Sequence, residues 1–269
     1  MPPCVMGTSA DSLASGQANS HMLNARWSPE AVYTVFWTPY IVREHFPVMA
    51  PAESGSLDVQ RYLGWSEDIF RDPRGAHINN NPGASLTGAI PLLLLRPVLV
   101  RVDEWNQKLP RPVRKSTSDE GELFWRTAAE GGALCFLLVA FVTVAMVMAP
   151  ATSGTAAYLC SRLTETRVPA ASAVGAALVY GVGTPVLFRV GHLNHNLLVG
   201  DAGITALLLL WDPKDRPLAP GRAVMAGLLA GYAVLCDYSG VVVVAVTALY
   251  MWLRAAGQPG EQRWRAMAA

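Results

Sequence analysis

The sequence has 269 residues, of which 52% are hydrophobic and only 15% are charged, whereas about 25% of the residues of an average soluble domain are charged. The formal net charge of +1 gives no indication of nucleic-acid binding, and nucleic acid is not an expected partner. This composition favours a lipid environment. We expect an all-α membrane protein: a multi-span helical bundle with a long extracytoplasmic loop that carries interfacial helices, and with the lipid bilayer as a partner.

The N-terminal part of the chain precedes the first clear apolar segment. Residues 1–30 lack the basic start and the apolar core of a signal peptide, and they are typical of a disordered tail. Residues 31–43 are apolar and aromatic, but Pro39 interrupts them and they have about half the length of a span. We expect a partial first span there.

Residues 44–129 are the predicted extracytoplasmic loop, which is polar with short apolar islands. In Ser56–Phe70 the apolar residues recur at helical spacing, Ser56 can cap the start, and Pro73 forbids continuation. This pattern predicts a helix that lies on the membrane surface.

A second apolar island in the loop is Ser85–Val100, which contains Pro91, Arg96 and Pro97. The island is short for a span, and an Arg in the middle of a lipid-facing helix costs several kcal/mol. We therefore expect a re-entrant or interfacial helix rather than a span.

Residues 130–255 are the predicted transmembrane bundle, and 256–269 are a predicted cytoplasmic tail. A single helix over the last apolar stretch would be about 54 Å long, nearly twice the roughly 30 Å hydrocarbon core. We therefore expect two helices joined by a turn at Asp237–Gly240, because Asp, Ser and Gly favour turns. The expected apolar segments are Gly131–Met148 with a continuation past a kink at Pro150 as far as Leu163, Val168–Phe188, Leu197–Trp211 and Leu218–Leu253.

The short loops between these segments differ in their content of Lys and Arg. The loops on one side contain Arg189 alone, so the positive-inside rule places that side outside the cytoplasm. Alternation of spans carries residues 44–129 to the same outer side. The cations of the opposite, cytoplasmic side are Arg162, Arg167, Lys214, Arg216, Arg222, Arg254, Arg263 and Arg265.

Three acidic residues are thereby predicted to surround one cavity at the outer face: Asp58, Asp201 and Asp237. Asp58 is the candidate catalytic residue, because a carboxylate in a water-accessible cleft can take a proton from an acceptor hydroxyl or bind a metal ion. The cofactor is therefore unknown, with a divalent metal ion left open. The structural alternative is an acid placed near a helix N-terminus.

The other candidates are predicted to bind substrate. His192 and His195 are three residues apart and can share a ligand or proton, although an interfacial polar turn is the alternative. Asp201 lies inside a predicted span, where an ionisable group is expensive; a cap or an interhelical hydrogen bond is the alternative. Amide and guanidinium donors suit sugar hydroxyls or phosphate oxygens. The set is Tyr62, Arg71, Arg74, Asn80, Asn81, His192, His195, Asp201 and Asp237, and it includes no metal ligands.

The order of these motifs resembles the polytopic glycosyltransferases of the GT-C fold, such as the aminoarabinose and protein mannosyltransferase groups. Asp58–Tyr62 resembles their acidic Asp-Glu-x-x-Tyr pattern, with Val59 where the second acid is usual. Asn80–Leu86 stands where they have a Lys-Pro-Pro-Leu type motif. Gly227–Asp237 is similar to their Gly-rich helix, with Asp237 in place of the usual Lys or Arg.

The resemblance implies transfer of a sugar from a polyprenyl-phosphate-linked donor to an acceptor on the extracytoplasmic face of a bacterial inner (plasma) membrane, with Asp58 as the base. Members of these families have more spans, so a truncated or divergent member is expected. Two other functions stay open. One is a non-catalytic membrane subunit or degenerate paralogue that binds lipid or a partner protein. The other is a transporter, which the few intramembrane charges and the lack of an inverted repeat disfavour.

Overall fold

The computed structural model describes residues 39–63, 69–78, 81–109, 132–166, 168–183, 185–214 and 216–257. The predicted tail at 1–30, most of the partial span at 31–43 and the residues from 258 onward lie outside these ranges. The described chain is mostly helical. Its elements are α2 (Pro39–Ser54), η2 (Gln60–Tyr62), β1 (Ile69–Asp72), β2 (Gly75–Ile78), α3 (Pro82–Asn106), α5 (Gly132–Thr143), η3 (Val144–Met148), α6 (Ala149–Thr164), α7 (Ala170–Val182), α8 (Val186–Val190), α9 (His195–Leu210), α10 (Pro220–Cys236) and α11 (Gly240–Ala256).

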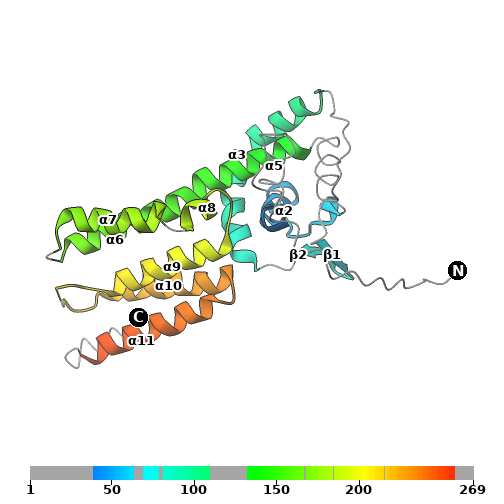
Figure 1. The fold of residues 1–269 in the computed structure, drawn as a ribbon. Coiled ribbons are helices and arrows are strands. Elements are labelled where there is room, and N and C mark those ends of the chain that lie inside the picture. The colour runs from blue at the N-terminus through cyan, green and yellow to red at the C-terminus, as the bar shows by residue number, and fades with distance from the viewer. Residues whose placement is uncertain are drawn as a thin grey trace, which may run out of the picture.

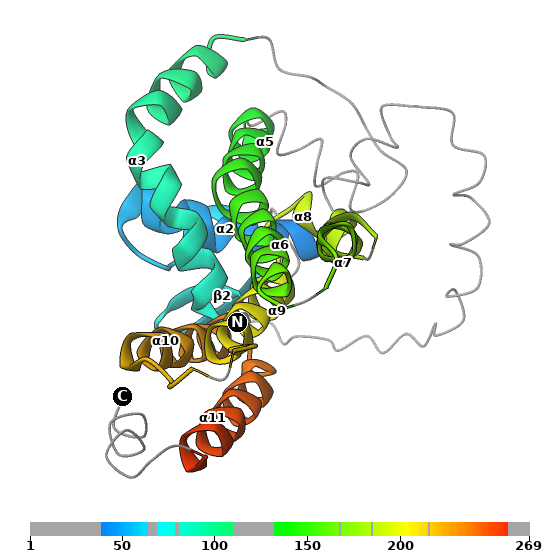
Figure 2. The same ribbon diagram turned by 90° about the vertical axis from the view of Figure 1, so that its left-hand side faces the viewer.

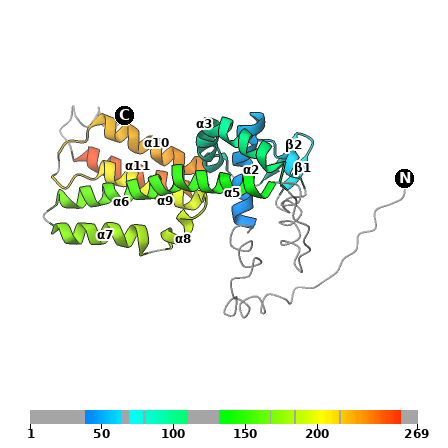
Figure 3. The ribbon, with the colours of Figure 1, turned by 90° about the horizontal axis from the view of Figure 1, so that it is seen from above.

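Helices α6, α7, α9, α10 and α11 lie side by side and form an elongated bundle (Figure 1). Figure 2 looks along this bundle and shows α9 between α6 on one side and α10 and α11 on the other. We call the end with the turns Gly191–Asn194 and Asp237–Ser239 the α2 end, because α2 lies against it. The opposite end, with the loops at 165–169 and 211–219, is the arginine end. Helix α2 separates the bundle from the β1–β2 hairpin, as Figures 1 and 3 agree.

The helix continues through Pro150, where the sequence predicts a kink. Proline cannot donate a backbone hydrogen bond, and its ring crowds the carbonyl four residues earlier. The structure accommodates it with the π-helical turn η3, directly before Pro150. Helix therefore runs on to Thr164, and the stretch Phe136–Thr164 alone has 29 residues, or about 44 Å.

Helix α3 corrects the expectation of a short re-entrant helix around Ser85–Val100. It continues through both Pro91 and Pro97 and has 25 residues, or about 37 Å. In the described part of the chain, α3 and Phe136–Thr164 are the two helical stretches long and apolar enough to cross a membrane by length and composition. The prolines distort such a helix but need not end it, because only the local backbone hydrogen bonds are lost.

The last apolar run breaks at the predicted turn. Helix α10 ends at Cys236, α11 begins at Gly240, and the two helices pack together. A Cβ on Gly240 would collide with the backbone of Ala233, so the close turn requires glycine. The predicted segment Val168–Phe188 also forms two helices, because α7 ends at Val182 and α8 begins at Val186. Pro185, which directly precedes α8, has no backbone N–H and cannot donate a helical hydrogen bond.

The predicted surface helix over Ser56–Phe70 is wrong for the residues described there. The described residues form a single 3-10 turn, η2, and then strand β1. Residues 64–68, between the two, lie outside the described ranges. Strand β1 pairs antiparallel with β2, in the register Ile69 to Ile78 and Asp72 to Gly75. Helical spacing of a few apolar residues could not anticipate this hairpin, because its backbone hydrogen bonds come from residues beyond the predicted helix.

Candidate functional site

Three ionisable side chains from separate elements meet at the α2 end. They are Glu44 of α2, His195 at the first position of α9, and Asp237 in the turn between α10 and α11. Nδ1 of His195 forms a hydrogen bond with Oε1 of Glu44, and Nε2 of His195 lies 3.6 Å from Oδ2 of Asp237. The imidazole therefore lies between two carboxylates. We call these three residues the carboxylate–histidine cluster.

The members of the cluster differ in their exposure to the surface. Glu44 and His195 are buried, whereas the side chain of Asp237 is 30% exposed. Oε2 of Glu44 has no hydrogen-bond partner among the described residues. A buried carboxylate oxygen is costly to leave unpaired, so Oε2 of Glu44 is available to accept a hydrogen bond from a polar ligand atom.

Local hydrogen bonds explain why His195 and Asp237 stand where they do. Helix α9 begins at His195 because Asn194 caps it, with Oδ1 accepting the amide of Leu197 at 3.0 Å. At the end of α10, Oδ1 of Asp237 accepts the amide of Ser239 at 2.8 Å. The Ser239 hydroxyl and amide hold the pKa of Asp237 below its usual value, and the nearby His195 adds a smaller effect in the same direction. Asp237 is thus a carboxylate at neutral pH.

His192 lies beside the cluster but outside α9, so the two histidines do not occupy successive turns of one helix. Its Nε2 lies 3.2 Å from Nδ2 of Asn194. Burial lowers the pKa of His192, the charge of Glu44 opposes this shift, and the charge of Arg189 reinforces it. The neutral imidazole is therefore favoured, and His192 serves the turn as a hydrogen-bond partner.

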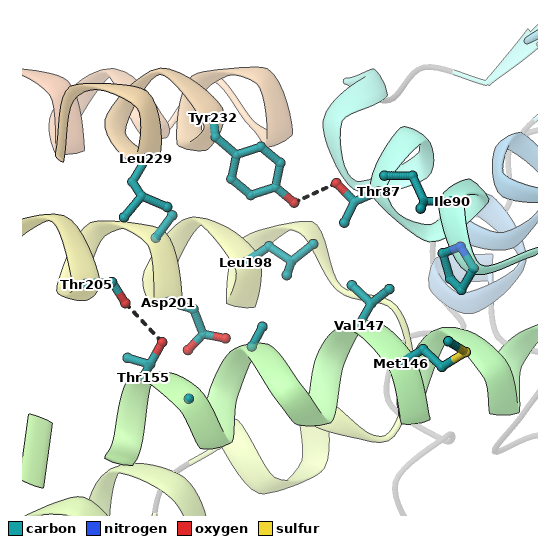
Figure 4. A pocket seen from close by; sticks show the side chains of 14 residues that line it. Thr87, Ile90, Met146, Val147, Thr155, Leu198, Asp201, Thr205, Leu229 and Tyr232 are labelled. Carbon is teal, nitrogen blue, oxygen red and sulfur yellow. Dashed lines mark hydrogen bonds between the residues drawn. The ribbon is translucent and has the colours of Figure 1, made fainter. Parts of the chain in front are cut away.

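Asp201 lies deeper in the bundle and lines a cavity of about 570 Å³ between α3, η3, α6, α9 and α10 (Figure 4). Its Oδ2 accepts the hydroxyl of Thr152 at 2.8 Å, and its Oδ1 accepts the hydroxyl of Tyr180. Asp58 and Asp237 do not line this cavity. The expectation that the three aspartates surround one cavity is therefore not met here.

Asp58 lies in the loop before η2 and contacts the hairpin at Gly75 and Ala76. Its Oδ1 accepts the amides of Gln60 and Ala76, at 2.9 and 3.0 Å, and its carboxylate lies against Gly75. Gly75 has a φ of +144°, a conformation that few side chains tolerate. A Cβ there would lie 3.1 Å from Cγ of Asp58. Through these contacts, Asp58 holds the loop before η2 against strand β2.

The remaining predicted residues lie in η2, on the hairpin and directly before α3. Tyr62 is buried and stacks on Phe46, with 4.8 Å between ring centroids. Arg71 and Arg74 are exposed on the hairpin, where Nε of Arg71 lies 3.4 Å from Oε1 of Gln60. Asn81 precedes α3 and donates from Nδ2 to the carbonyl of Val234, at 3.4 Å. Asn80 lies outside the described residues.

Sequence reasoning missed Glu44. Its only local signal is the polar triplet Arg43-Glu44-His45 between the apolar residues 41–42 and 46–50. Its partner His195 is 151 positions away, so no local pattern could reveal the pairing. Tyr180 and Thr152 were missed for the same reason, since only the packing of α6, α7 and α9 brings them to Asp201.

The carboxylate–histidine cluster at the α2 end contains two carboxylates and one imidazole. These groups can transfer protons and bind hydroxyl or cationic groups. In the described ranges, no three His, Cys, Asp or Glu side chains are arranged so that they could hold a metal ion. No protein-family model, no curated protein and no solved structure matches this chain.

Proposed function

We propose that the chain is an integral membrane protein whose bundle crosses the bilayer with the α2 end outside the cytoplasm. Large apolar side chains on the outside of the helices support this placement, among them Leu94, Phe141 and Leu228, which are 72%, 68% and 63% exposed. A soluble protein rarely exposes apolar surface on this scale. The cations Arg162, Arg216, Arg222 and Arg254 at the opposite end agree with the positive-inside rule.

We further propose that the protein transfers a sugar from a polyprenyl-phosphate-linked donor to an acceptor hydroxyl at the α2 end. The observation that carries this proposal is the position of His195 between Glu44 and Asp237. Sugar transfer to a hydroxyl requires a group that removes its proton, and histidine does so near neutral pH. The cluster, rather than Asp58, is our candidate base, because Oδ1 of Asp58 is already occupied by two backbone amides.

Each member of the cluster has a distinct part in this proposal. Glu44 holds Nδ1 of His195 and so directs Nε2 toward the surface. The 3.6 Å between Nε2 and Oδ2 of Asp237 is too long for a direct hydrogen bond, which leaves Nε2 accessible to an acceptor hydroxyl. Asp237 then stabilises the imidazolium that forms. Arg189 follows Phe188 on the same end and is our candidate partner for the donor phosphate.

The test is a transfer assay with the full chain in lipid nanodiscs, a labelled polyprenyl-phosphate sugar and a membrane-extract acceptor. His195→Ala is expected to lower the transfer rate by about 10²–10⁴-fold, the usual contribution of a general base. Glu44→Gln should lower it less, and Glu104→Gln, an exposed residue near the end of α3, serves as the matched control. Asp58→Asn separates the two candidate bases: a larger loss there than in His195→Ala, at equal folded fraction, would refute our assignment.

A purely structural cluster is the competing explanation. Glu44, His195 and Asp237 tie α2 to α9 and to the α10–α11 turn, and a non-catalytic subunit would need the same link. In that case the wild-type protein would transfer no sugar, while Glu44→Gln would still lower the unfolding temperature. The two measurements together therefore distinguish a transferase from a non-catalytic membrane subunit.

A further inference from the structure

The cavity at Asp201 is apolar except at a few points. Aliphatic and thioether side chains form most of its wall, including Ile90, Met146, Val147, Leu198 and Leu229. Its hydroxyl groups are paired with one another: Thr87 with Tyr232 at 2.8 Å, and Thr155 with Thr205 at 3.1 Å (Figure 4). Among the described residues that line the cavity, Asp201 is the one of the Asp, Glu, Lys and Arg types.

Hydroxyl groups contact both carboxyl oxygens of Asp201. Tyr180 donates to one oxygen and Thr152 to the other, so both oxygens act as acceptors and each keeps a further lone pair. Among the described residues, Asp201 forms no ion pair with a Lys, Arg or His side chain. Two hydroxyl groups do not supply a countercharge, and a buried carboxylate is normally paired with one.

The surroundings of Asp201 define what could supply this countercharge. A cavity of about 570 Å³ falls within the range of roughly 300–1,000 Å³ that small-molecule sites occupy. Most of the wall would face an apolar body rather than a hydrated ion. Ile90 and Met146 are 59% and 48% exposed, so the cavity opens on the flank of the bundle, which faces lipid if the bundle crosses the bilayer.

We infer that this cavity binds a single-chain amphiphile with a primary ammonium group, which pairs with the Asp201 carboxylate while its alkyl chain covers the apolar wall. The ligand is recognised by charge at one point and by apolar area elsewhere. The site is distinct from the carboxylate–histidine cluster, and the inference does not depend on sugar transfer.

The experiment measures binding of decylamine, decanol and decanoate to the full chain in phosphatidylcholine nanodiscs by titration calorimetry, with empty nanodiscs subtracted. The wild type should bind decylamine roughly tenfold or more tighter than decanol, because truncating one partner of a buried charge pair costs at least that much. Decanoate should bind most weakly. Asp201→Asn, which keeps the shape of the side chain, should abolish the preference for the amine and leave decanol binding unchanged.

A second variant keeps Asp201 intact and removes the space instead. Gly154 lines the cavity, and a Cβ there would meet nothing within 4 Å, so Gly154→Leu should occupy part of the cavity and weaken the binding of decylamine and decanol alike. Gly227→Leu is the matched control, because Gly227 is equally open and does not line the cavity. Equal binding of decylamine and decanol to the wild type would overturn the inference. So would amine binding that survives Gly154→Leu or Asp201→Asn unchanged.

Discussion

Replacing Gly83 by alanine tests the close packing of α3 against α10, which brings Asn81 to the carbonyl of Val234. A Cβ on Gly83 would lie 2.6 Å from the backbone C and O of Leu235 and 2.7 Å from N of Cys236. Backbone atoms cannot rotate away as a flexible side chain can, so α3 and α10 must separate. Overpacking of this kind costs about 1–3 kcal/mol, and we expect the upper part of that range.

The helix propensity of alanine offsets part of this cost, by at most about 1 kcal/mol relative to glycine. The net loss of unfolding free energy for Gly83→Ala is then about 2 kcal/mol, which corresponds to roughly 4–8 °C in the midpoint temperature. The control is Gly231→Ala on α10, where a Cβ meets nothing within 4 Å. It should raise the midpoint, because it keeps the propensity gain and avoids the clash.

The assay is thermal unfolding of the detergent-purified protein, followed by circular dichroism, for the wild type and both variants. Opposite shifts for Gly83→Ala and Gly231→Ala are the expected result. If the two variants shifted together, or Gly83→Ala were stabilised, α3 and α10 would not approach as closely as described, and the position of Asn81 would be wrong.

Two further predictions concern the hairpin and the arginine end. Gly75→Ala should cost about 1–3 kcal/mol, because alanine rarely adopts positive φ and its Cβ would press on Asp58; faster amide exchange at Ala76 would report it, and unchanged exchange would contradict it. Burial would raise the pKa of Asp212, but the Lys214 amide and Arg216 guanidinium outweigh it and hold that pKa below its usual value. The stability from Asp212 is therefore complete above about pH 4 and lost as pH falls through the folded pKa, so Asp212→Asn should flatten the acid limb of an unfolding-versus-pH curve.

Sequence patterns predicted the features that depend on neighbouring residues. The break of the last apolar run follows from the turn chemistry of Asp237–Gly240, and the observed helices end and begin on either side of it. His195 and Asp237, which were both predicted to bind substrate, lie at the same end of the bundle, with 3.6 Å between Nε2 and Oδ2; substrate binding itself stays a prediction. Both results rest on local length and turn signals.

Features set by distant contacts could not be predicted in this way. The helix predicted over Ser56–Phe70 does not form in the described part of that segment, where Asp58 accepts a hydrogen bond from the amide of Ala76, 18 positions away. Glu44 was overlooked because its role depends on packing of α2 against α9. Asp201 was expected to join the other aspartates, but its hydrogen bonds to Tyr180 and Thr152 fix it inside the bundle.

The side of the membrane on which the carboxylate–histidine cluster lies can be measured by labelling single cysteines with a membrane-impermeant maleimide, after replacing the four native cysteines by serine. Tyr238, which is 78% exposed, and Gly257 stand at opposite ends of α11, a helix of 17 residues or about 25 Å. We expect Tyr238→Cys to react in intact cells and Gly257→Cys to react only after permeabilisation. Reaction of both from one side, or the reverse pattern, would contradict a bundle that crosses the membrane with its cluster outside.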